Sequence, residues 1–253
     1  MNKTVLITGA TSGIGLGCAQ KFAANGDRLI LNGRNVKKLE TIRQQLQAKG
    51  TEVLILAFDV RDREAARRAI ERLPEEWQQI DVLVNNAGLA LGLEPEYEGD
   101  LDDWETMIDT NIKGLLTMTR LVVPGMMERN RGHIINVGSV AGDAAYANGN
   151  VYCATKSAVK TLSDGLRLDV ADSNIRVTNL KPGLVETNFS NVRFHGDTER
   201  AAKVYKGIDP LTGDDIADVA VYAANAPEHV QIAEVLILAT YQGSGSVIVR
   251  KLN

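Results

Sequence analysis

Seven short runs of apolar residues are spread along the chain, and most are rich in Val, Ile and Leu without alternating polar positions. Strands buried on both faces have this pattern, because neither row of side chains meets water. The expected strands are 4–8, 28–31, 53–58, 81–84, 133–137, 176–180 and 234–238. Helical patterns lie between them, at 13–25, 36–49, 61–72, 102–129, 150–172 and 213–224.

This alternation of strand and helix predicts right-handed crossovers and one parallel sheet. With no internal repeat or linker to divide the chain, we expect a single α/β domain over residues 1–253. It would be a doubly wound Rossmann fold, with a seven-stranded parallel sheet and helices on both faces. Segment 186–208 is too long for an ordinary connection, and loops of that length are usually lids or binding segments. We expect a lid over the substrate there.

Composition and charge exclude several other classes of protein. Of the 253 residues, 44% are apolar and 24% are charged, which suits a globular domain, and the net charge of −4 gives no sign of nucleic-acid binding. The sequence has no apolar run of about 18 residues, and the first strand is expected from residue 4, so we expect neither a membrane span nor a signal peptide. Cys18 and Cys153 fall in different expected helices, which indicates a reducing compartment and a cytoplasmic protein.

A glycine-rich turn follows the first expected strand. Gly9, Gly13 and Gly15 stand between that strand and a helix. This order brings backbone N–H groups and a helix N-terminus against a pyrophosphate. Gly9 and Gly13 would allow the tight turn and close backbone approach, and Gly15 close packing of the helix. Alone the motif is weak, because a bare turn has the same residues.

A second motif consists of Ser139, Tyr152 and Lys156. The gap of four residues places Tyr152 and Lys156 on one face of a helix, while Ser139 follows the strand 133–137. A phenol has an ordinary pKa of about 10 and is a poor base at neutral pH. A nearby ammonium favours the phenolate, and a serine hydroxyl can share the proton that moves. The three residues therefore suit proton transfer at a carbonyl or alcohol oxygen.

Arg34 indicates which dinucleotide is bound. It stands after the second expected strand, where an NAD-binding chain usually carries an acid for the ribose 2′-hydroxyl. No acidic residue occurs between Asp27 and Glu40. A guanidinium can pair with a 2′-phosphate, so we favour NADP over NAD. A solvated surface arginine is the alternative.

Together, the glycine spacing and the residues Ser139, Tyr152 and Lys156 resemble the classical short-chain dehydrogenase/reductase family. Six motif elements occur in the family's order. The resemblance implies that Asp59 and Val60 hold the adenine, that the 85–88 segment lines the cofactor, and that the turn after 176–180 holds the nicotinamide carboxamide. The expected cofactor-binding residues are Gly9, Thr11, Ser12, Gly13, Ile14, Gly15, Arg34, Asn35, Asp59, Val60, Asn86, Ala87, Tyr152, Lys156, Pro182, Gly183, Val185 and Thr187.

Two of these positions keep other interpretations. Asp59 can also cap a helix that begins at Arg61, and both roles can coexist. Asn111 lies within the long expected helix 102–129 and would be an ordinary helix asparagine on spacing alone. By resemblance it is the fourth catalytic position, which holds a water that links Lys156 to solvent.

Segments 85–95, 103–111 and 182–197 look similar to one bacterial branch of the family, the NADP-dependent 3-hydroxy acid dehydrogenases. That branch implies hydride transfer between NADP(H) and the 3-hydroxyl carbon of a small acid such as serine, allo-threonine or 3-hydroxypropionate. It also implies a homotetramer, built through the helices after strands 81–84 and 133–137. The 239–253 tail lacks the double glycine common in the wider family, which leaves its contacts undecided.

In this interpretation Tyr152 exchanges the proton, Lys156 lowers the pKa of Tyr152 and holds the nicotinamide ribose, and Ser139 polarises the substrate oxygen. Arg193, in segment 186–208, is the candidate partner of the substrate carboxylate, with a surface role as the alternative. The three histidines are scattered and the cysteines form no cluster, so we expect no metal. The rival functions are reduction of 3-oxoacyl groups or general ketones, and non-catalytic NADP binding.

Overall fold

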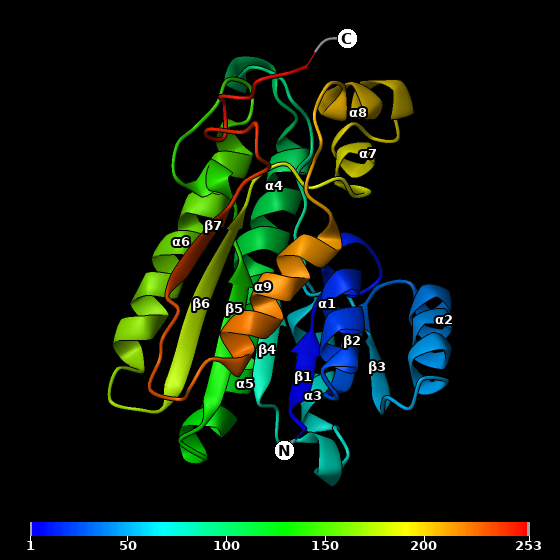
Figure 1. The fold of residues 1–253 in the computed structure, drawn as a ribbon, viewed down its shortest axis with the longest axis vertical. Coiled ribbons are helices and arrows are strands. Elements are labelled where there is room, and N and C mark those ends of the chain that lie inside the picture. Colours follow the sequence, from blue (N-terminus) through cyan, green and yellow to red (C-terminus); the bar gives the residue numbers. More distant parts are fainter. Residues whose placement is uncertain (1, 252–253) are drawn as a thin grey trace.

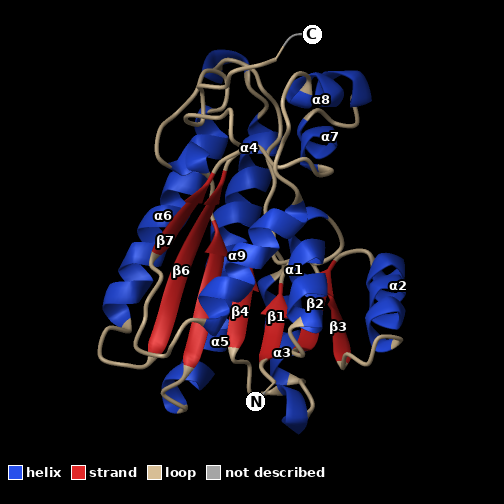
Figure 2. Ribbon diagram, in the orientation of Figure 1, coloured by secondary structure: helices blue, strands red, loops and turns tan. Residues whose placement is uncertain are grey.

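The computed structural model describes residues 2–251, and its centre is a sheet of seven parallel strands in the order β3-β2-β1-β4-β5-β6-β7 (Figures 1 and 2). The order reverses between β1 and β4, and ligands of open α/β sheets bind beyond the strand ends at such a point. The predicted fold class is confirmed. The strands are β1 (Thr4–Ile7), β2 (Arg28–Gly33), β3 (Val53–Ala57), β4 (Val82–Asn85), β5 (Gly132–Val137), β6 (Ile175–Pro182) and β7 (Glu234–Ile237).

Helices cover both faces of this sheet. The α-helices are α1 (Gly13–Ala24), α2 (Val36–Gln47), α3 (Arg63–Glu71), α4 (Leu101–Ile108), α5 (Leu115–Glu128), α6 (Asn150–Asp169), α7 (Phe189–Arg193), α8 (Thr198–Tyr205) and α9 (Gly213–Asn225). Short 3₁₀ turns are η1 (Glu75–Trp77), η2 (Glu96–Glu98) and η4 (Val140–Gly142), and η3 (Asp109–Gly114) is a π-helix. In Figure 1, α1 and α9 lie in front of the sheet and α5 lies behind it.

Two apolar cores explain why the strands show no polar alternation. Val5 and Ile7 of β1 point to the core shared with α1, α2 and α9, while Leu6 points to the core shared with α3 and α5. All three side chains are completely buried. Since both faces of the strand are covered, both rows of side chains must be apolar.

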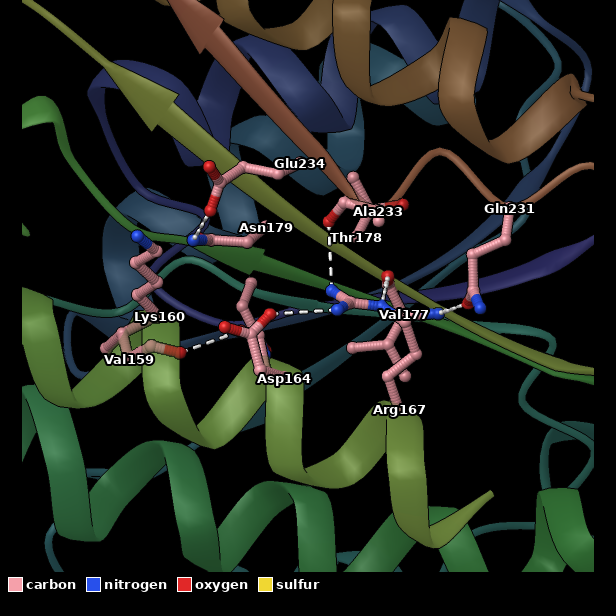
Figure 3. A network of polar contacts seen from close by, with 12 residues as sticks. Val159, Lys160, Asp164, Arg167, Val177, Thr178, Asn179, Gln231, Ala233 and Glu234 are labelled. Carbon is pink, nitrogen blue, oxygen red and sulfur yellow. Dashed lines mark hydrogen bonds and ion pairs between the residues drawn. The ribbon is translucent and has the colours of Figure 1, made fainter. Parts of the chain in front are cut away.

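Helix α6 is fastened to the sheet by polar contacts near its C-terminal half (Figure 3). The Arg167 guanidinium donates to the carbonyl of Val177 in β6 at 3.4 Å and to that of Ala233 at 3.1 Å, and it pairs with Asp164 at 2.8 Å. The amide N–H of Val177 donates to the side-chain oxygen Oε1 of Gln231 at 2.8 Å. These contacts fix α6 and the approach to β7 on the edge of β6.

Two expectations about local structure need revision. The α3 helix begins at Arg63 and its cap is Asp62, whose carboxylate accepts the N–H of Ala65 at 2.9 Å. The alternative role of Asp59, as the cap of a helix from Arg61, is therefore wrong; its carboxylate instead accepts hydrogen bonds from Arg61. The expected helix 102–129 is also interrupted by η3, where the hydrogen-bond ladder changes to the π spacing.

The expected lid segment contains two short helices, α7 and α8, which lie above the carboxyl ends of the strands (Figure 1). Asp197 caps α8 by accepting the N–H of Arg200 at 2.9 Å. Within residues 2–251, no helix has the length and apolar character needed to cross a membrane.

Candidate active site

The carboxyl ends of the strands open into a cleft of about 560 Å³, closed on one side by α7 and α8. The cleft contains most of the residues that the sequence assigned to cofactor or substrate. Those lining it are Gly9, Thr11, Ser12, Gly13, Ile14, Arg34, Asp59, Val60, Asn86, Ala87, Ser139, Tyr152, Lys156, Pro182, Gly183, Val185, Thr187 and Arg193. Gly15, Asn35 and Asn111 do not line it.

The glycine turn has the backbone that its residues allow. Gly9 and Gly13 have φ angles of 65° and 54°, in the left-handed region that favours glycine. A Cβ on Gly15 would lie 2.3 Å from the Gly9 carbonyl oxygen, so only glycine lets α1 pack this close to the turn. Asn86 stabilises the turn, since its amide donates to the carbonyls of Thr8 at 2.9 Å and Gly9 at 3.1 Å. The result is a shallow cradle of backbone that a dinucleotide pyrophosphate fits.

Helix α6 brings Tyr152 and Lys156 to the cleft, as the spacing predicted. The Lys156 ammonium donates to the carbonyl of Val137 at 2.9 Å and lies 5.9 Å from the centre of the Tyr152 ring. Ser139 caps η4, where its hydroxyl accepts the N–H of Ala141 at 3.1 Å. The structure therefore places all three side chains at one end of the cleft.

Burial changes the pKa values of the two ionisable groups in opposite directions. It raises the pKa of Tyr152 above its ordinary value, and Tyr146 adds to this effect, while hydrogen bonding with Ser139 and the charge of Arg193 oppose it. Burial alone lowers the pKa of Lys156 to about 8. Removal from water disfavours the charged form of each group, the phenolate and the ammonium alike.

Asn111 lies in the π-helix η3 and is only 2% exposed. Its side-chain amide donates to the Leu89 carbonyl at 2.8 Å and to the Thr155 hydroxyl at 3.0 Å, and its carbonyl oxygen accepts the Leu89 N–H at 2.9 Å. The side chain thus joins the loop after β4 to α6. π-helical turns are frequent at functional sites.

At the opposite end of the cleft, two arginines surround one carboxylate. Arg34 is 68% exposed, with its Nη1 3.7 Å from Asp59 Oδ2, and Arg61 pairs with the same oxygen at 2.8 Å. Arg61 was not identified from the sequence, where it read only as the start of a helix. Asn35 caps α2 by accepting the N–H of Lys38 at 3.0 Å, which keeps Arg34 at the helix entrance. This electropositive corner suits a phosphate on the ribose.

Arg193, the last residue of α7, reaches the Tyr152 end of the cleft. Its Nε donates to the Gly92 carbonyl at 3.0 Å and its Nη1 to the Tyr146 hydroxyl at 2.9 Å. Tyr146 was also missed by sequence reasoning. The available signal was an aromatic residue in the small-residue loop just before Tyr152, which is too general to assign a partner.

The tail, left undecided by the sequence, also contributes to the cleft. Gln242 and Ile248 line it, and the side-chain oxygen Oε1 of Gln242 accepts the N–H of Leu184 at 2.9 Å. Arg250 donates to the carbonyls of Val204 at 3.0 Å and Lys206 at 2.6 Å, at the end of α8. The tail therefore supports both the turn after β6 and the end of α8.

No group of three or more His, Cys, Asp or Glu side chains suited to a metal ion occurs among residues 2–251. Both cysteines are free and buried. Burial raises the pKa of the Cys18 thiol to about 12 and that of Cys153 above its ordinary value. Since the thiolate is the nucleophile, neither cysteine is set up for covalent chemistry.

The chain is similar in sequence and structure to known proteins. Residues 3–197 match the family model described as short chain dehydrogenase. The chain is 50% identical over 249 residues to a probable NADP-dependent dehydrogenase of Haemophilus influenzae, with 98% of each protein covered. It is 49% identical over 248 residues to the NADP-dependent 3-hydroxy acid dehydrogenase YdfG of Salmonella typhi, covering 98% of this chain and 99% of that protein. The closed form of serine dehydrogenase complexed with NADP+ has a TM-score of 0.93 and 45% identity, covering 98% and 100% of the two chains.

The similarities to these relatives extend over nearly the whole chain. The family model alone spans most of the chain, and the relatives share about half of their residues with it. The resemblance inferred from the motifs is thus confirmed. The chain belongs to the short-chain dehydrogenase family.

Proposed function

We propose that the protein catalyses reversible hydride transfer between NADP(H) and the 3-hydroxyl carbon of a small 3-hydroxy acid, such as serine, allo-threonine or 3-hydroxypropionate. The observation that carries this proposal is the grouping of Ser139, Tyr152, Lys156 and Arg193 at one end of the cleft. Similar proteins named as NADP-dependent 3-hydroxy acid dehydrogenase and serine dehydrogenase support it.

When bound, NADP supplies the hydride acceptor for oxidation and NADPH the donor for reduction. The cradle fits this group, because Gly9 and Gly13 leave room for its pyrophosphate, and a Cβ on Gly13 would lie 3.0 Å from Thr187 Cγ2. Arg34, with Asp59 and Arg61 beside it, would hold the 2′-phosphate. Pro182, Gly183, Val185 and Thr187 line the cleft where the nicotinamide carboxamide would lie.

Tyr152 takes the proton of the substrate alcohol during oxidation and returns it to the carbonyl during reduction. Ser139 donates a hydrogen bond to the same substrate oxygen. Lys156 holds the nicotinamide ribose and favours the phenolate, and Asn111 orders the relay of protons toward solvent. Holding the reacting atoms about 3–3.5 Å apart can lower a barrier by about 7–11 kcal/mol, so orientation supplies a large share of the acceleration.

Arg193 is the proposed partner of the substrate carboxylate. Its Nε and Nη1 are occupied by Gly92 and Tyr146, while its Nη2 donates to no group in residues 2–251. One terminal nitrogen of a fixed guanidinium is thus available to a substrate anion. The guanidinium carbon is 5.8 Å from the centre of the Tyr152 ring, a separation that a three-carbon acid can bridge.

The proposal also includes a homotetramer in the cytoplasm. Apolar side chains exposed on α5 and α6 support assembly, namely Leu116 at 42% and Leu168 at 78%. The cytoplasmic assignment rests on the two free thiols, Cys18 and Cys153. Sedimentation of the purified protein would test the assembly, and a monomer at micromolar concentration would contradict it.

The function is tested by following NADPH absorbance with NADP or NAD and a panel of L-serine, D-serine, L-allo-threonine, 3-hydroxypropionate and 3-hydroxyisobutyrate. We expect NADP to be reduced with several of these acids and NAD to be reduced little. In Arg193→Met, the KM for these acids should rise about 10- to 100-fold, because a charged hydrogen bond contributes about 1.5–3 kcal/mol. The KM for an uncharged ketone should change much less.

No reduction of NADP with any of these acids, together with oxidation of NADPH by uncharged ketones, would reject the acid substrates and indicate a ketone reductase. Equal changes of KM for acids and ketones in Arg193→Met would reject the carboxylate role of that residue.

A further inference from the structure

One face of helix α7 rests on Tyr152. Phe189 and Arg193 are four residues apart, so they lie on the same side of this short helix. The Phe189 ring meets the Tyr152 ring edge-on, with centres 5.6 Å apart and planes at 63°. The guanidinium carbon of Arg193 is 5.8 Å from the centre of the same Tyr152 ring. The lid therefore brings a positive charge next to the proposed base.

The position of that charge is fixed from two sides. Nε of Arg193 donates to the Gly92 carbonyl at 3.0 Å, and the Arg193 carbonyl accepts the Gly92 N–H at 2.9 Å. Nη1 donates to the Tyr146 hydroxyl at 2.9 Å, and the guanidinium carbon is 5.6 Å from the centre of the Tyr146 ring. The guanidinium is thus held close to the rings of both Tyr146 and Tyr152.

Arg193 and Lys156 lie at similar distances from the centre of the Tyr152 ring. The Lys156 ammonium is 5.9 Å from the centre of the Tyr152 ring, against 5.8 Å for the Arg193 guanidinium. The two cations differ in how they titrate. Burial lowers the pKa of Lys156 to about 8, so its charge is lost at mildly alkaline pH, whereas a guanidinium stays charged.

We propose that Arg193 has a second task, which rests on the proposed function of this site: its permanent charge favours the phenolate of Tyr152 while α7 is seated. The base is then fully available for alcohol oxidation only when the lid is closed. A bound carboxylate neutralises part of this charge, so an acid substrate and a neutral substrate meet a base of different strength.

Electrostatics agree with this geometry. The charge of Arg193 lowers the pKa of Tyr152, against the larger effect of burial, which raises it. Other titratable or charged groups near Arg193 and Tyr152 also affect a pH profile. Facing Tyr152 are Ser139, Tyr146, Cys153 and Lys156. Glu94, Asp100 and Asp103 line a small cavity next to Arg193.

His195 is the remaining titratable group close to Arg193, and it pairs with Asp103 at 2.9 Å across the lid. Its φ of 52° is left-handed, a conformation that asparagine tolerates well. His195→Asn therefore removes the imidazole and suits the left-handed backbone at this position. This substitution should be present in every variant that is compared by pH.

The test uses a matched pair of substrates, 3-hydroxypropionate and its neutral amide, 3-hydroxypropionamide. We would measure the pH dependence of kcat/KM for the amide in the His195→Asn background, with Arg193→Met, Arg193→Lys and Arg200→Met. Arg200 is the matched control, because it belongs to the lid but pairs with Glu94 at 3.5 Å and stacks on Phe194.

Since an opposite charge within about 4–6 Å moves a pKa by about 1–3 units, Arg193→Met should shift the acid limb upward by about 1 pH unit or more. Arg193→Lys should return the acid limb of the pH profile most of the way to its position in the parent, and Arg200→Met should leave that limb unchanged. In the parent, the kcat limb should lie at higher pH with the acid than with the amide, because kcat reports the substrate complex. An unmoved limb in Arg193→Met would overturn the proposal, whatever happens to KM.

A direct titration separates this proposal from the proposed function. The phenolate absorbance of Tyr152 is obtained by subtracting the pH titration of Tyr152→Phe from that of the parent, with and without Arg193→Met. A higher midpoint of the Tyr152 titration with Arg193→Met than without it supports the proposal, and equal midpoints overturn it. This readout needs no turnover, so it decides the matter even if no hydroxy acid is a substrate.

Discussion

Helix α6 and the lid contribute to the same end of the cleft, but they are held there in different ways. α6 is 20 residues long and is fastened to β6 and to the approach to β7 through Arg167. α7 and α8 have five and eight residues. The lid segment is held by side-chain contacts with loops and the tail, such as Arg193 with Gly92 and Tyr146, and Arg250 with Val204 and Lys206.

This contrast suggests a division of labour. Proton transfer needs side chains held within fractions of an ångström, which a long packed helix provides. Selection of substrate needs a surface that can open, and we expect the short helices α7 and α8, joined by a left-handed turn, to open more readily than α6. The turn is visible at His195 and Gly196, whose φ angles are 52° and 90°. In this view Tyr152 transfers the proton, and Arg193 binds the substrate carboxylate and favours the phenolate of Tyr152 when the lid is closed.

The largest expected effect comes from removing the tyrosine hydroxyl in α6. Tyr152→Phe should lower kcat by about 10²–10⁴-fold or more, because general acid–base catalysis supplies an acceleration of that size. Binding of NADP should persist, since the ring remains in place. Steady-state turnover and NADP titration of the purified variant provide the measurement.

Tyr205→Phe is the matched change in the lid, where the lost hydroxyl bonds Ser190 at 2.8 Å and Val185. Its kcat should stay within about 3-fold while its KM rises by less than about 10-fold, because a net hydrogen bond contributes about 1 kcal/mol. Equal losses of kcat in the two variants would remove the distinction between the regions.

The sequence predicted α6 far better than it predicted the lid, and the reason is physical. The spacing of Tyr152 and Lys156 is a property of one helix, which local sequence determines. The pairing of Arg193 with Tyr146 joins residues 47 positions apart, which no local pattern encodes. Helices as short as α7 are also marginal alone and depend on tertiary contacts.

In the rest of the fold, too, the sequence predicted local elements but not contacts between distant residues. The seven strands follow from apolar runs, and their observed bounds differ from the expected ones by only a residue or two. The π-helix η3 could not be expected, because Asn111 is held there by Leu89 and Thr155 on other elements. Asp62 displaced Asp59 as the α3 cap because only its carboxylate reaches the Ala65 N–H.

A second comparison concerns stability, because burying Lys156 in α6 is unfavourable. Its pKa of about 8 in the folded state lies below the ordinary 10.5, so the unfolded state binds more protons between these values. Stability should therefore rise with pH through this window, and the full penalty should be present below about pH 8. One pKa unit corresponds to about 1.4 kcal/mol, which makes the penalty about 3 kcal/mol.

Lys156→Met should remove this penalty but lose the hydrogen bond to the Val137 carbonyl, worth about 1 kcal/mol. Below pH 8 the variant should thus be more stable by about 2 kcal/mol, although inactive. Urea unfolding of both proteins from pH 7 to 10.5 gives the difference, in which the titration of other groups cancels. A difference that does not change with pH would show that the lysine is not buried as a charge.

The smallest expected effect separates the lid from α6 most directly. Arg250 satisfies the last carbonyls of α8 at Val204 and Lys206, as a helix C-terminus requires. Arg250→Ala should loosen α8 by about 1 kcal/mol, or roughly 5-fold faster amide hydrogen exchange, without affecting α6. Hydrogen exchange read by mass spectrometry measures both helices in one sample. Arg200→Ala, which removes the exposed pair with Glu94 and the contact with the Phe194 ring, is the control and should have a smaller effect on α8. If α6 exchanged faster to the same extent as α8, the lid and the catalytic helix would form one cooperative unit, and closure of the lid could not be regulated separately from the proposed base.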